Sequence, residues 1–456
     1  MTGPARPRAV VVVDLGFGDA GKGLATDALV RRHGARVVVR WNGGAQAGHN
    51  VVAPDGRHHT FSQLGAGSFV PGVRTVLAAP VVVHPTSLRH EADALARRGV
   101  PDPLARVLVD ERARLVTPWH QAANRLRELA RGDARHGSCG VGVGEAVADA
   151  LAHRDDVVVA GDLRDRAALA SRARRVRDRV RASLDGLALP ATSDVEAERA
   201  VFDDPTLPTA WVAWACGVAR CVASPPAIVA ALRAEPVLVL EGAQGVLLDE
   251  THGFHPHTTW SDCTPAAARR VLSELAPDAA PEVLGVLRAH GVRHGPGPFP
   301  TAHPAVSAAV VEHNATNAWQ GSVRHGWFDG VLSRYALAVV GGVDALLLTH
   351  VDALARRSSW RVAASYELPD DAPADLVRRD AAGRADLVAA TAPSLERQAR
   401  LAGLLARCAP VLDEVPADER GYVGAVERVL GRRVDAVARG PTAADVEDRD
   451  GGGARR

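Results

Sequence analysis

Gly16-Phe17-Gly18-Asp19-Ala20-Gly21-Lys22-Gly23 is the stretch that decides the fold of this 456-residue chain. The Val-rich run Ala9–Asp14 precedes it, and an apolar-periodic run, Leu24–Val30, follows it. A β-branched run, a glycine-rich turn and a helical pattern in this order are typical of a phosphate-binding loop, in which backbone N–H groups at a helix start face an anion. We therefore expect a strand, a phosphate loop and a helix here.

Lys22 is the only lysine in the chain, although arginines are abundant. A compact ammonium fits a phosphate cradle for which a planar guanidinium is too wide. The alternatives are chance retention of one lysine, or a glycine turn that binds no ligand. The position of Lys22 between a predicted strand and a predicted helix favours a role on phosphates.

The loop has Walker spacing but ends differently, because Gly23 follows Lys22 where Ser or Thr normally supplies a magnesium ligand. Another oxygen must then hold the metal. Asp19 is the candidate, since Mg²⁺ takes hard oxygen ligands and usually one or two carboxylates besides phosphates. We expect Gly18 and Gly21 to contact the phosphates together with Lys22 and Gly23.

Apolar β-branched runs recur along the chain with helical patterns between them. They are Val37–Arg40, Thr75–Val83, Arg106–Val109, Val237–Leu240, Val283–Leu287, Ala345–Leu348 and Val434–Val437. Strands that are apolar on both faces and alternate with helices indicate a parallel or mostly parallel sheet, covered by helices on both sides. The predicted fold class is α/β, a P-loop-like fold with a large central sheet and an inserted helical lobe.

The bulk composition excludes several classes of protein. A formal net charge of +1 argues against a dedicated nucleic-acid binder, which would carry a basic face or tract. Runs of about 18 apolar residues do not occur, so we expect no membrane partner, and we read residues 9–14 as a strand rather than a signal peptide. Five widely spaced cysteines without a C-x-x-C pair indicate reduced thiols and a cytoplasmic protein.

The chain reads as one domain, residues 1–442, with a helical insertion at 163–233 and a tail at 443–456. Residues 163–181 are rich in Arg and Asp at helical spacing, which predicts a solvated helix rather than a binding face. The tail ends in Asp-Arg-Asp-Gly-Gly-Gly-Ala-Arg-Arg, a composition that favours disorder.

A second glycine-rich segment, residues 40–50, follows the next predicted strand and leads up to His49. Its small residues allow the backbone to approach a ligand closely. Taken alone, a histidine in a loop is usually structural or merely exposed. Beside a phosphate loop, His49 becomes a candidate general acid or a stabiliser of phosphoryl charge.

These two segments resemble the N-terminal signature of the adenylosuccinate synthetase family, roughly W-G-D-E-G-K-G and G-G-H-N-A-G-H. Five later segments resemble family blocks in the same order. They start with Glu241-Gly242-Ala243-Gln244-Gly245 and continue at residues 293–301, 326–329, 348–352 and 439–441. Each block alone is weak, but seven in one order, from Val10 to Pro441, make the chain similar to this family over nearly its whole length.

The resemblance implies a GTP-dependent carbon–nitrogen ligase. In that family the γ-phosphoryl group of GTP moves to O6 of IMP, and the amino group of aspartate then displaces phosphate. Asp19 would bind Mg²⁺ and take the N1 proton, Lys22 would contact the phosphates, and His49 would stabilise the charge that moves between phosphate and O6. The Gly48 carbonyl would help to hold the metal, and Gln244 would bond the N1/O6 edge of the purine.

For the guanine base the resemblance implies a site at Thr349, His350 and Asp352, with Gly440 and Pro441. A carboxylate such as Asp352 can accept both N1–H and N2–H of guanine, whereas adenine offers neither in that geometry. His350 stands where the family has a lysine whose stem packs on the base, and an imidazole could stack there instead. Without the other blocks, Asp352 would read as a helix N-cap after a strand.

Departures from the family pattern gather on the acceptor side. The family loop G-T-T-G-R-G-I-G-P corresponds to residues 137–145, where Cys139 replaces a phosphate-binding threonine and Val141 replaces an arginine. A thiol is a weak donor, although Cys139 also fits the role of a small buried apolar residue. Arg154 would stand in for the arginine that the family donates across its dimer interface. The acceptor-binding candidates are Gln46, Ser138, Cys139, Arg154, Gln244 and Thr259.

The family's aspartate loop, T-T-G-R-R-R-R-T-G-W, corresponds to residues 319–327, which are one residue shorter and keep a single arginine, Arg324. An arginine fork is the natural partner of a carboxylate. The loss of three arginines therefore removes charge that would bind the two carboxylates of aspartate. The amine-binding candidates are Gln320, Gly321, Ser322 and Arg324.

The sequence thus predicts a GTP- and Mg²⁺-dependent ligase, homodimeric as in the family, that joins a purine nucleotide to aspartate or a related amine. The rebuilt loops leave open a paralogue that uses a modified purine, another lactam acceptor or a different amine. A catalytically inactive GTP-binding regulator and a kinase that stops at the phosphorylated acceptor are the alternatives from other classes. Asp19, His49 and Gln244 favour an enzyme, because GTP binding alone requires neither His49 nor Gln244.

Overall fold

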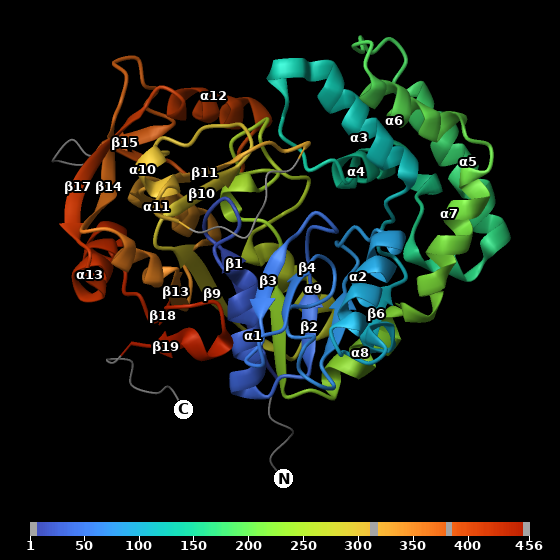
Figure 1. Ribbon diagram of the computed structural model, residues 1–456, viewed down its shortest axis with the longest axis horizontal. Helices are drawn as coiled ribbons and strands as arrows, with labels where there is room; N and C mark the ends of the chain where they lie inside the picture. Colours follow the sequence, from blue (N-terminus) through green and yellow to red (C-terminus); the bar gives the residue numbers. More distant parts are fainter. Residues whose placement is uncertain (1–6, 311–317, 380–384, 450–456) are drawn as a thin grey trace.

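The central sheet has ten strands in the order β19-β18-β13-β9-β1-β8-β2-β5-β6-β7 (Figure 1). The structure, a computed structural model, describes residues 7–310, 318–379 and 385–449. The strands are β1 Arg8–Asp14, β2 Val37–Arg40, β5 Arg74–Leu77, β6 Val107–Asp110, β7 Val222–Ala223, β8 Val237–Glu241, β9 Ala280–Arg288, β13 Ala345–Thr349, β18 Ala436–Ala438 and β19 Val446–Asp448. Neighbouring strands are parallel except for β18 and β19, so the predicted α/β fold with a mostly parallel sheet is confirmed.

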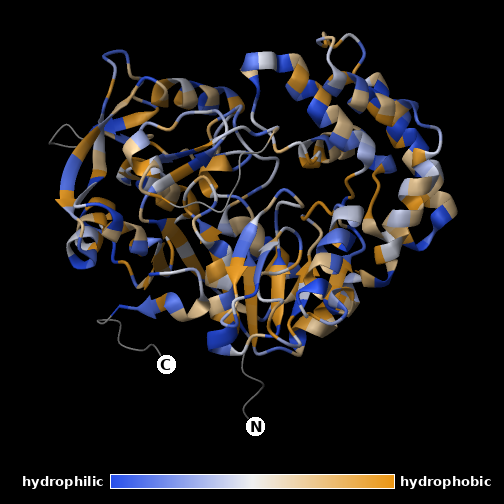
Figure 2. Ribbon diagram, viewed as in Figure 1, coloured by the Kyte–Doolittle hydropathy of each residue, from blue (hydrophilic) through white to orange (hydrophobic). Residues whose placement is uncertain are grey.

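The valine run of β1 explains why this strand lies in the middle of the sheet. Val11 and Val13 pack into one hydrophobic core, and Val12 packs into the core on the opposite face. α1 (Lys22–His33) covers the Val12 face, whereas α9 (Pro265–Leu275) and α11 (Gly330–Val340) cover the other face. The central strands are accordingly the most hydrophobic part of Figure 2.

A helical lobe stands beside the sheet, but its boundaries differ from the predicted 163–233. The remaining helices of eight or more residues are α2 Pro85–Arg97, α3 Pro118–Arg131, α4 Val143–Ala152, α5 Arg166–Ala182, α6 Ser193–Asp203, α7 Leu207–Ala215, α8 Pro225–Arg233, α12 Leu395–Leu405 and α13 Glu419–Leu430. Trp119 of α3 packs edge-on against Trp211 of α7, and both belong to the core that contains Val176 of α5. The lobe therefore includes α3, while α8 packs on the core of the sheet through Ile228 and Leu232.

The charged segment 163–181 behaves as predicted. It forms α5, whose buried residues are Leu169, Ala173, Val176 and Val180. These residues recur every three or four positions, so they make a single apolar stripe. The arginines and aspartates cover the other faces of the helix.

A second, smaller sheet consists of β12 (Phe328–Asp329), β14 (Ser359–Glu367) and β17 (Ala409–Pro416). The sequence patterns did not predict β14 and β17. Five of the eight residues in β17 are exposed and its sequence carries two acids, so it lacks the continuous apolar run of a buried parallel strand. The short hairpins are β3 His49–Val52 with β4 His58–Phe61, β10 Gly291–His294 with β11 Val323–Gly326, and β15 Val377–Arg379 with β16 Ala385–Leu387; the short helix α10 is Pro304–Ser307.

The predicted disordered tail from 443 is wrong for residues 443–449. Ala443–Asp445 form a 3-10 turn in which Asp445 accepts hydrogen bonds from the N–H and hydroxyl of Thr442, and β19 then pairs antiparallel with β18. The edge strand β18 has free backbone groups that such a partner satisfies. Residues 450–456 lie outside the described part of the chain.

The parallel arrangement decides where the predicted site residues meet. The carboxyl ends of β13, β9, β1, β8 and β2, which are adjacent in the sheet, lie at one edge, where ligands of open α/β sheets bind. The loops that leave this edge carry the glycine-rich, histidine and glutamine motifs. Across the described residues, no helix is long and apolar enough to cross a membrane.

Candidate active site

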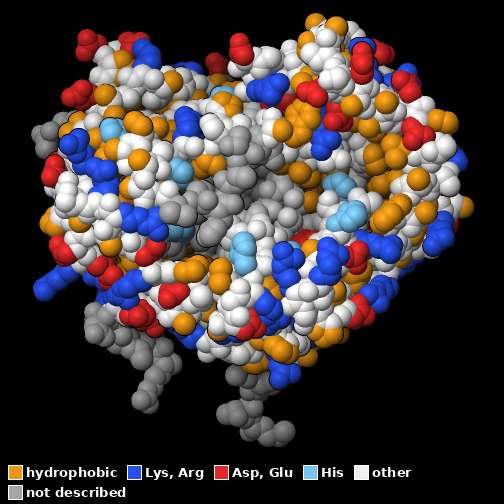
Figure 3. All heavy atoms as spheres, in the orientation of Figure 1, with side chains coloured by type: hydrophobic (Ala, Val, Ile, Leu, Met, Phe, Trp, Pro, Cys, Tyr) orange, Lys and Arg blue, Asp and Glu red, His pale blue; other side chains and the backbone are white. Residues whose placement is uncertain are grey.

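A cleft of about 990 Å³ opens at this edge of the sheet, and residues of α3 and α4 form part of its wall. Figure 3 shows the corresponding face hollowed between the two lobes, with histidine side chains around the hollow. The predicted site residues that line the cleft are Gly18, Asp19, Lys22, Gln46, Gly48, His49, Ser138, Cys139, Gln244, Thr259 and Gln320. Residues from five separate sequence blocks therefore meet in one cavity.

The phosphate loop connects β1 to α1, and its backbone turns sharply at three positions with positive φ. These angles are 93° at Gly18, 57° at Asp19 and 100° at Gly21. Glycine adopts these angles without strain. Asp19 has a left-handed backbone conformation that is uncommon outside glycine. Lys22 begins α1, and its Nζ lies 2.8 Å from Oδ2 of Asp14, the last residue of β1.

Gly23 differs from a Walker Ser or Thr for a steric reason. A Cβ at this position would lie 2.8 Å from the carbonyl oxygen of Asn50 and 3.0 Å from Cβ of His49. The close packing of α1 against β3 therefore excludes a hydroxyl side chain here. Gly21 and Gly23 are not among the residues that line the cleft.

Asp19 is paired with a histidine that the sequence analysis gave no role. Its Oδ2 lies 2.6 Å from Nε2 of His294, and Arg288 donates to its carbonyl oxygen at 3.3 Å. Burial raises the pKa of Asp19, but the hydrogen bond and charge of His294, with the charges of Lys22 and Arg288, outweigh burial and leave the pKa below its ordinary value. Asp19 is thus ionised at neutral pH and suited to hold a cation.

His49 is buried and held by a second buried carboxylate. Its Nδ1 lies 2.6 Å from Oε1 of Glu241, the last residue of β8, while Oε2 of Glu241 accepts the N–H of Ala66 at 3.0 Å. Burial lowers the pKa of His49 and Glu241 raises it, with a net pKa below the ordinary value. The bond to Glu241 directs Nε2 away from it, and Nε2 has no hydrogen-bond partner in the described part of the chain.

Two glutamines add more unsatisfied polar atoms to the cleft. The Oε1 of Gln244, and both Oε1 and Nε2 of Gln46, are buried without a partner among the residues that the structure describes. Gln244 also has a φ of 56°, a left-handed conformation that is uncommon outside glycine. Buried polar groups are normally hydrogen-bonded, so these atoms indicate a polar ligand.

The acceptor loop lies on the wall of the cleft, as expected from its sequence position. Ser138 donates to Oδ1 of Asn124 at 3.0 Å, and burial raises the pKa of the Cys139 thiol, which keeps it neutral. Thr259 lines the same cleft. Arg154 does not: it is exposed, in a 3-10 turn after α4, outside the cleft of its own chain.

The amine loop reaches the cleft through Gln320, whereas Gly321, Ser322 and Arg324 are not among the lining residues. Arg324 donates to the carbonyls of Gly295 and Gly297 at 2.7 and 3.0 Å, so its guanidinium braces the neighbouring turn. The two rebuilt loops are also in contact with each other. A Cβ at Gly140 would lie 2.7 Å from the ring of Trp319.

The predicted guanine-site residues lie outside the cleft, at the ends of β13 and β18. Thr349 donates its hydroxyl to the carbonyl of Ala20 at 2.7 Å, which joins this region to the phosphate loop. His350 has a φ of 58°, and the exposed Asp352 follows in a 3-10 turn. Gly440 packs against the carboxylate of Asp445, next to Pro441.

Comparison with known proteins agrees with this arrangement. A family model described as adenylosuccinate synthetase matches residues 11–446. The chain belongs to the adenylosuccinate synthetase family. It is 33% identical to the adenylosuccinate synthetase of Mycobacterium tuberculosis, with 95% of this chain and 96% of that protein covered, and 33% identical to that of Myxococcus xanthus, with 94% and 96% covered.

Solved structures show that the fold of the adenylosuccinate synthetase family extends over nearly the whole chain. The fully ligated adenylosuccinate synthetase from Plasmodium falciparum has a TM-score of 0.75 at 18% identity and covers 97% of this chain and 99% of its own. The succinoaminodeoxyadenylate synthetase of cyanophage S-2L, bound to dGMP and dATP, has a TM-score of 0.57 at 18% identity, with 97% and 95% covered. The resemblance found in the sequence is confirmed, and with it membership in a family of GTP-dependent ligases.

Three residues that hold predicted site side chains in place were missed in the sequence: Asp14, Glu241 and His294. Asp14 is a charged residue that directly follows the apolar run Ala9–Val13, and that position was a usable signal. Glu241 opens the quoted E-G-A-Q-G block, but nothing in the sequence links it to His49, 192 positions away. His294 occupies a variable position of its block, so only the tertiary structure pairs it with Asp19.

The residues present fit the Mg²⁺ that is typical of this family. Asp19 offers an ionised carboxylate, and Gly48 lines the same cleft with its backbone. Clusters of three or more His, Cys, Asp or Glu that could hold a metal are not found among the described residues. One carboxylate with backbone and phosphate oxygens is the kind of donor set that Mg²⁺ accepts.

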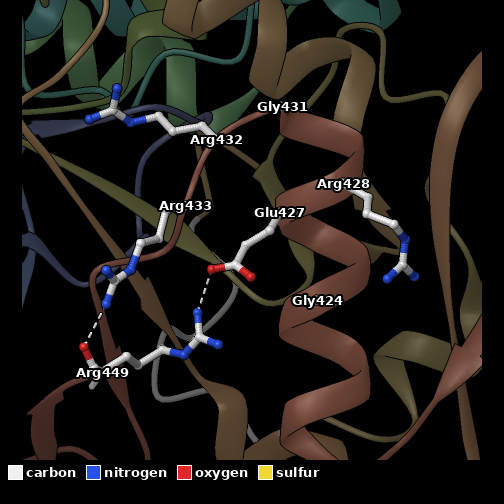
Figure 4. A pocket seen from close by; sticks show the side chains of 7 residues that line it. All are labelled: Gly424, Glu427, Arg428, Gly431, Arg432, Arg433 and Arg449. Carbon is white, nitrogen blue, oxygen red and sulfur yellow. Dashed lines mark hydrogen bonds and ion pairs between the residues drawn. The ribbon is translucent and has the colours of Figure 1, made fainter. Parts of the chain in front are cut away.

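A second depression, of about 640 Å³, is lined by Arg428, Arg432, Arg433 and Arg449 at the end of α13 (Figure 4). Three of these arginines bond to the protein itself. Arg449 lies 2.5 Å from Oε1 of Glu427, Arg433 donates to the carbonyl of Arg449, and Arg432 donates to that of Val343. Cations at a helix C-terminus also complement its dipole, so this depression reads as structural.

Proposed function

We propose that this enzyme phosphorylates the 6-oxygen of a purine nucleotide with GTP and replaces the phosphate by the amino group of aspartate or a related amine. The observation that carries the proposal is the set of buried polar atoms on Gln46, His49 and Gln244 that lack partners in the described structure. Such atoms destabilise a fold by about 1–3 kcal/mol each unless a ligand satisfies them. They line one cleft with Asp19 and Lys22, as a site for a polar purine and phosphates requires.

The first step is phosphoryl transfer. Asp19 accepts the N1 proton, electron density moves to O6, and O6 attacks the γ-phosphorus while the bond to the departing GDP oxygen breaks. Lys22 and a protonated His49 stabilise the charge on the transferred group. An anion in the cleft favours protonation of His49, because it adds to the attraction of Glu241. Mg²⁺ held by Asp19 and the Gly48 carbonyl would neutralise phosphate charge.

The second step forms the carbon–nitrogen bond. The amine nitrogen attacks C6, and inorganic phosphate leaves with the electron pair of the C6–O6 bond and takes up the proton that the amine nitrogen loses. Gln244 would hold the purine at N1 through both steps, and at O6 until O6 leaves with the phosphate. Ser138, Cys139 and Thr259 would position the acceptor, and Gln320 would approach the amine.

Guanine specificity would come from the region at the ends of β13 and β18. Asp352 would accept the N1–H and N2–H of the base, His350 would stack on it, and Gly440 and Pro441 would lie at its edge. The bond from Thr349 to the phosphate loop supports this placement, because it fixes the base site relative to the phosphates.

A different amine is the second candidate, and the arginines support it. Arg324 is committed to the carbonyls of Gly295 and Gly297, and Arg293 is committed to those of Pro296 and Pro298. The sequence from 302 to 323 contains no Lys or Arg. Few guanidinium groups are thus available to bind the two carboxylates of aspartate.

We place the enzyme in the cytoplasm as a homodimer, with Arg154 acting in the site of the partner. Its exposure outside its own cleft supports this role. The test is complementation: two inactive variants, Arg154→Ala and Asp19→Asn, are mixed after mild dissociation. Recovery of about a quarter of the wild-type turnover, the fraction expected for random mixing, supports action across the interface, and no recovery contradicts it.

The function is tested by phosphate release with GTP and magnesium, crossing IMP, GMP and their deoxy forms with aspartate and other amines, and recording product masses. Turnover on IMP with aspartate, absent in Asp19→Asn, supports aspartate as the amine. Turnover only with another amine supports the second candidate. A phosphorylated product without amine consumption, or GTP binding without any product, contradicts the ligase proposal.

A further inference from the structure

Asp14 is a fully buried carboxylate that none of the steps above uses. It ends β1, and both of its oxygens are bonded to the phosphate loop. Oδ1 accepts the N–H of Gly16 at 2.8 Å, and Oδ2 accepts the N–H of Ala20 at 2.9 Å and an ammonium hydrogen of Lys22 at 2.8 Å. One carboxylate therefore bonds the beginning, the middle and the end of the loop.

The Asp14–Lys22 ion pair is almost completely removed from solvent, since its side chains are 0% and 3% exposed. A buried charge is tolerated only when it is paired and its hydrogen bonds are satisfied. Asp14 meets this requirement through three donors. Lys22 uses one of its three N–H bonds on Asp14, which leaves two for a ligand.

Asp14 and Lys22 differ in their access to the cleft. Lys22 lines it, whereas Asp14 does not. The turn that carries Gln244 also packs against Asp14: a Cβ at Gly245 would lie 2.8 Å from Oδ1, and Leu247 donates its N–H to the carbonyl of Gly16 at 3.0 Å. Asp14 thus stands behind the phosphate loop and beside the Gln244 turn, and it can act on a ligand only through them.

We infer that Asp14 is a positioning residue that holds the Lys22 ammonium and the loop N–H groups in place for the phosphates of the nucleotide. The inference rests on the proposed function in one respect, namely that the loop binds nucleotide phosphates. Ala20 stands where the family pattern has Glu, and the carboxylate that holds Lys22 comes from the end of the strand before the loop. The contribution of Asp14 then depends on the phosphates of the ligand and not on its base.

The test is nucleotide binding by Asp14→Asn, measured by displacement of a fluorescent GTP analogue with GTP, GDP and guanosine in the presence of magnesium. The asparagine keeps the shape but loses the charge and one acceptor. Affinity for GTP and GDP should fall about 10- to 30-fold, the effect of losing a hydrogen bond to a charged group. Affinity for guanosine should change by less than about twofold.

Asp27→Asn is the matched control. Asp27 is also buried, lies in α1, and is paired with Arg31 at 2.8 Å. Its substitution should lower the unfolding temperature in the same range as Asp14→Asn and leave all three affinities unchanged. Unchanged GTP affinity in Asp14→Asn, or an equal loss for guanosine, would overturn the inference.

A comparison of Lys22→Met with the double variant Asp14→Asn/Lys22→Met covers the case in which Asp14→Asn does not fold. Asp14→Asn/Lys22→Met removes both charges, so no unpaired charge is buried and the variant is expected to fold. It should bind GTP within about threefold of Lys22→Met alone, because Asp14 acts mainly through Lys22 and the Oδ1 of asparagine can still accept the N–H of Gly16. A further tenfold loss in the double variant would contradict the inference. Wild-type protein that does not bind GTP would instead contradict the proposed function.

Discussion

The phosphate-loop side of the cleft and the acceptor–amine side differ in how their functional groups are held. On the first side, Asp19, Lys22 and His49 each have a specific buried or half-buried partner, at 2.6–2.8 Å. On the second side, Arg154 is exposed and Arg324 donates its hydrogen bonds to backbone carbonyls. The first side is therefore preorganised for chemistry before any ligand binds.

Under the proposed function, the difference separates the part of the site for phosphoryl transfer from the part for the acceptor and the amine. Phosphoryl transfer depends on positioned charges, and such charges gain strength in a preorganised, buried site. Under the proposed function, recognition of the acceptor and amine would depend on loops 137–145 and 319–326, which pack on each other through Gly140 and Trp319. Substitution on the first side should abolish chemistry, whereas substitution on the second should change substrate affinity.

The largest effect is expected for Asp19→Asn. An amide neither takes a proton nor balances the charge of a cation, so turnover should fall at least about 10³-fold. Steady-state phosphate release measures the loss, and thermal unfolding within a few degrees of wild type shows that the fold is intact. Residual turnover within about tenfold of wild type would remove Asp19 from the chemistry.

Glu241→Gln should reduce kcat about 10- to 100-fold with little change in the KM for GTP. The carboxylate orients His49 and raises its pKa, so its loss leaves the ring less well placed and less easily protonated. The variant His49→Asn and the double variant Glu241→Gln/His49→Asn test whether Glu241 acts through His49. If it does, the double variant loses no more turnover than His49→Asn alone. If the double variant loses the product of both single effects, Glu241 does not act through His49.

Arg324→Lys should raise the KM for the amine about tenfold and leave the KM for GTP within about twofold. Lysine cannot reproduce a planar group that donates to the carbonyls of both Gly295 and Gly297. Initial rates at varied amine and varied GTP separate the two constants. An equal rise in both would show that the two sides of the cleft are not independent.

Cys139→Thr should lower the KM for a nucleotide monophosphate about three- to fivefold, because a hydroxyl donates a better hydrogen bond than a neutral thiol. Cys139→Ser is the size-matched companion, and Cys139→Val, which adds bulk without a donor, is the control. An improvement with Val as large as that with Thr would indicate packing rather than phosphate recognition.

Asp329→Asn should alter stability and hardly affect activity. Asp329 caps α11 by accepting the N–H of Leu332 at 3.0 Å, and burial raises its pKa to about 6, although bonds from Leu332 and Tyr366 lower it. A carboxyl with a raised pKa stabilises the fold at low pH, and this stability is lost as pH rises through about 6. Urea unfolding between about pH 4 and 7 should show a fall in wild type, on the order of 2–3 kcal/mol, that the variant lacks.

Much of the fold was predictable because its signals are local. The valine run of β1, the glycine turn and α1 follow one another within 26 residues, from Arg8 to His33. The small sheet with β14 and β17 was not predicted, because exposed, partly charged strands lack the apolar run that marks a buried one. Residues 443–449 were also misjudged: their polar composition suggested disorder, but the free edge of β18 binds them.

The sequence by itself determined the phosphate loop, the parallel sheet and the order of the family blocks, because each depends on residues close together in the chain. It also indicated the two loops that depart from the family. The tertiary structure alone decided which carboxylate serves which group: Asp14 for Lys22, Glu241 for His49, and His294 beside Asp19. Asp14 and Glu241 end neighbouring strands of the central sheet, whereas His294 ends β10 in a separate hairpin. Their proximity to the groups they serve depends on how these strands are arranged in space, which no local pattern encodes.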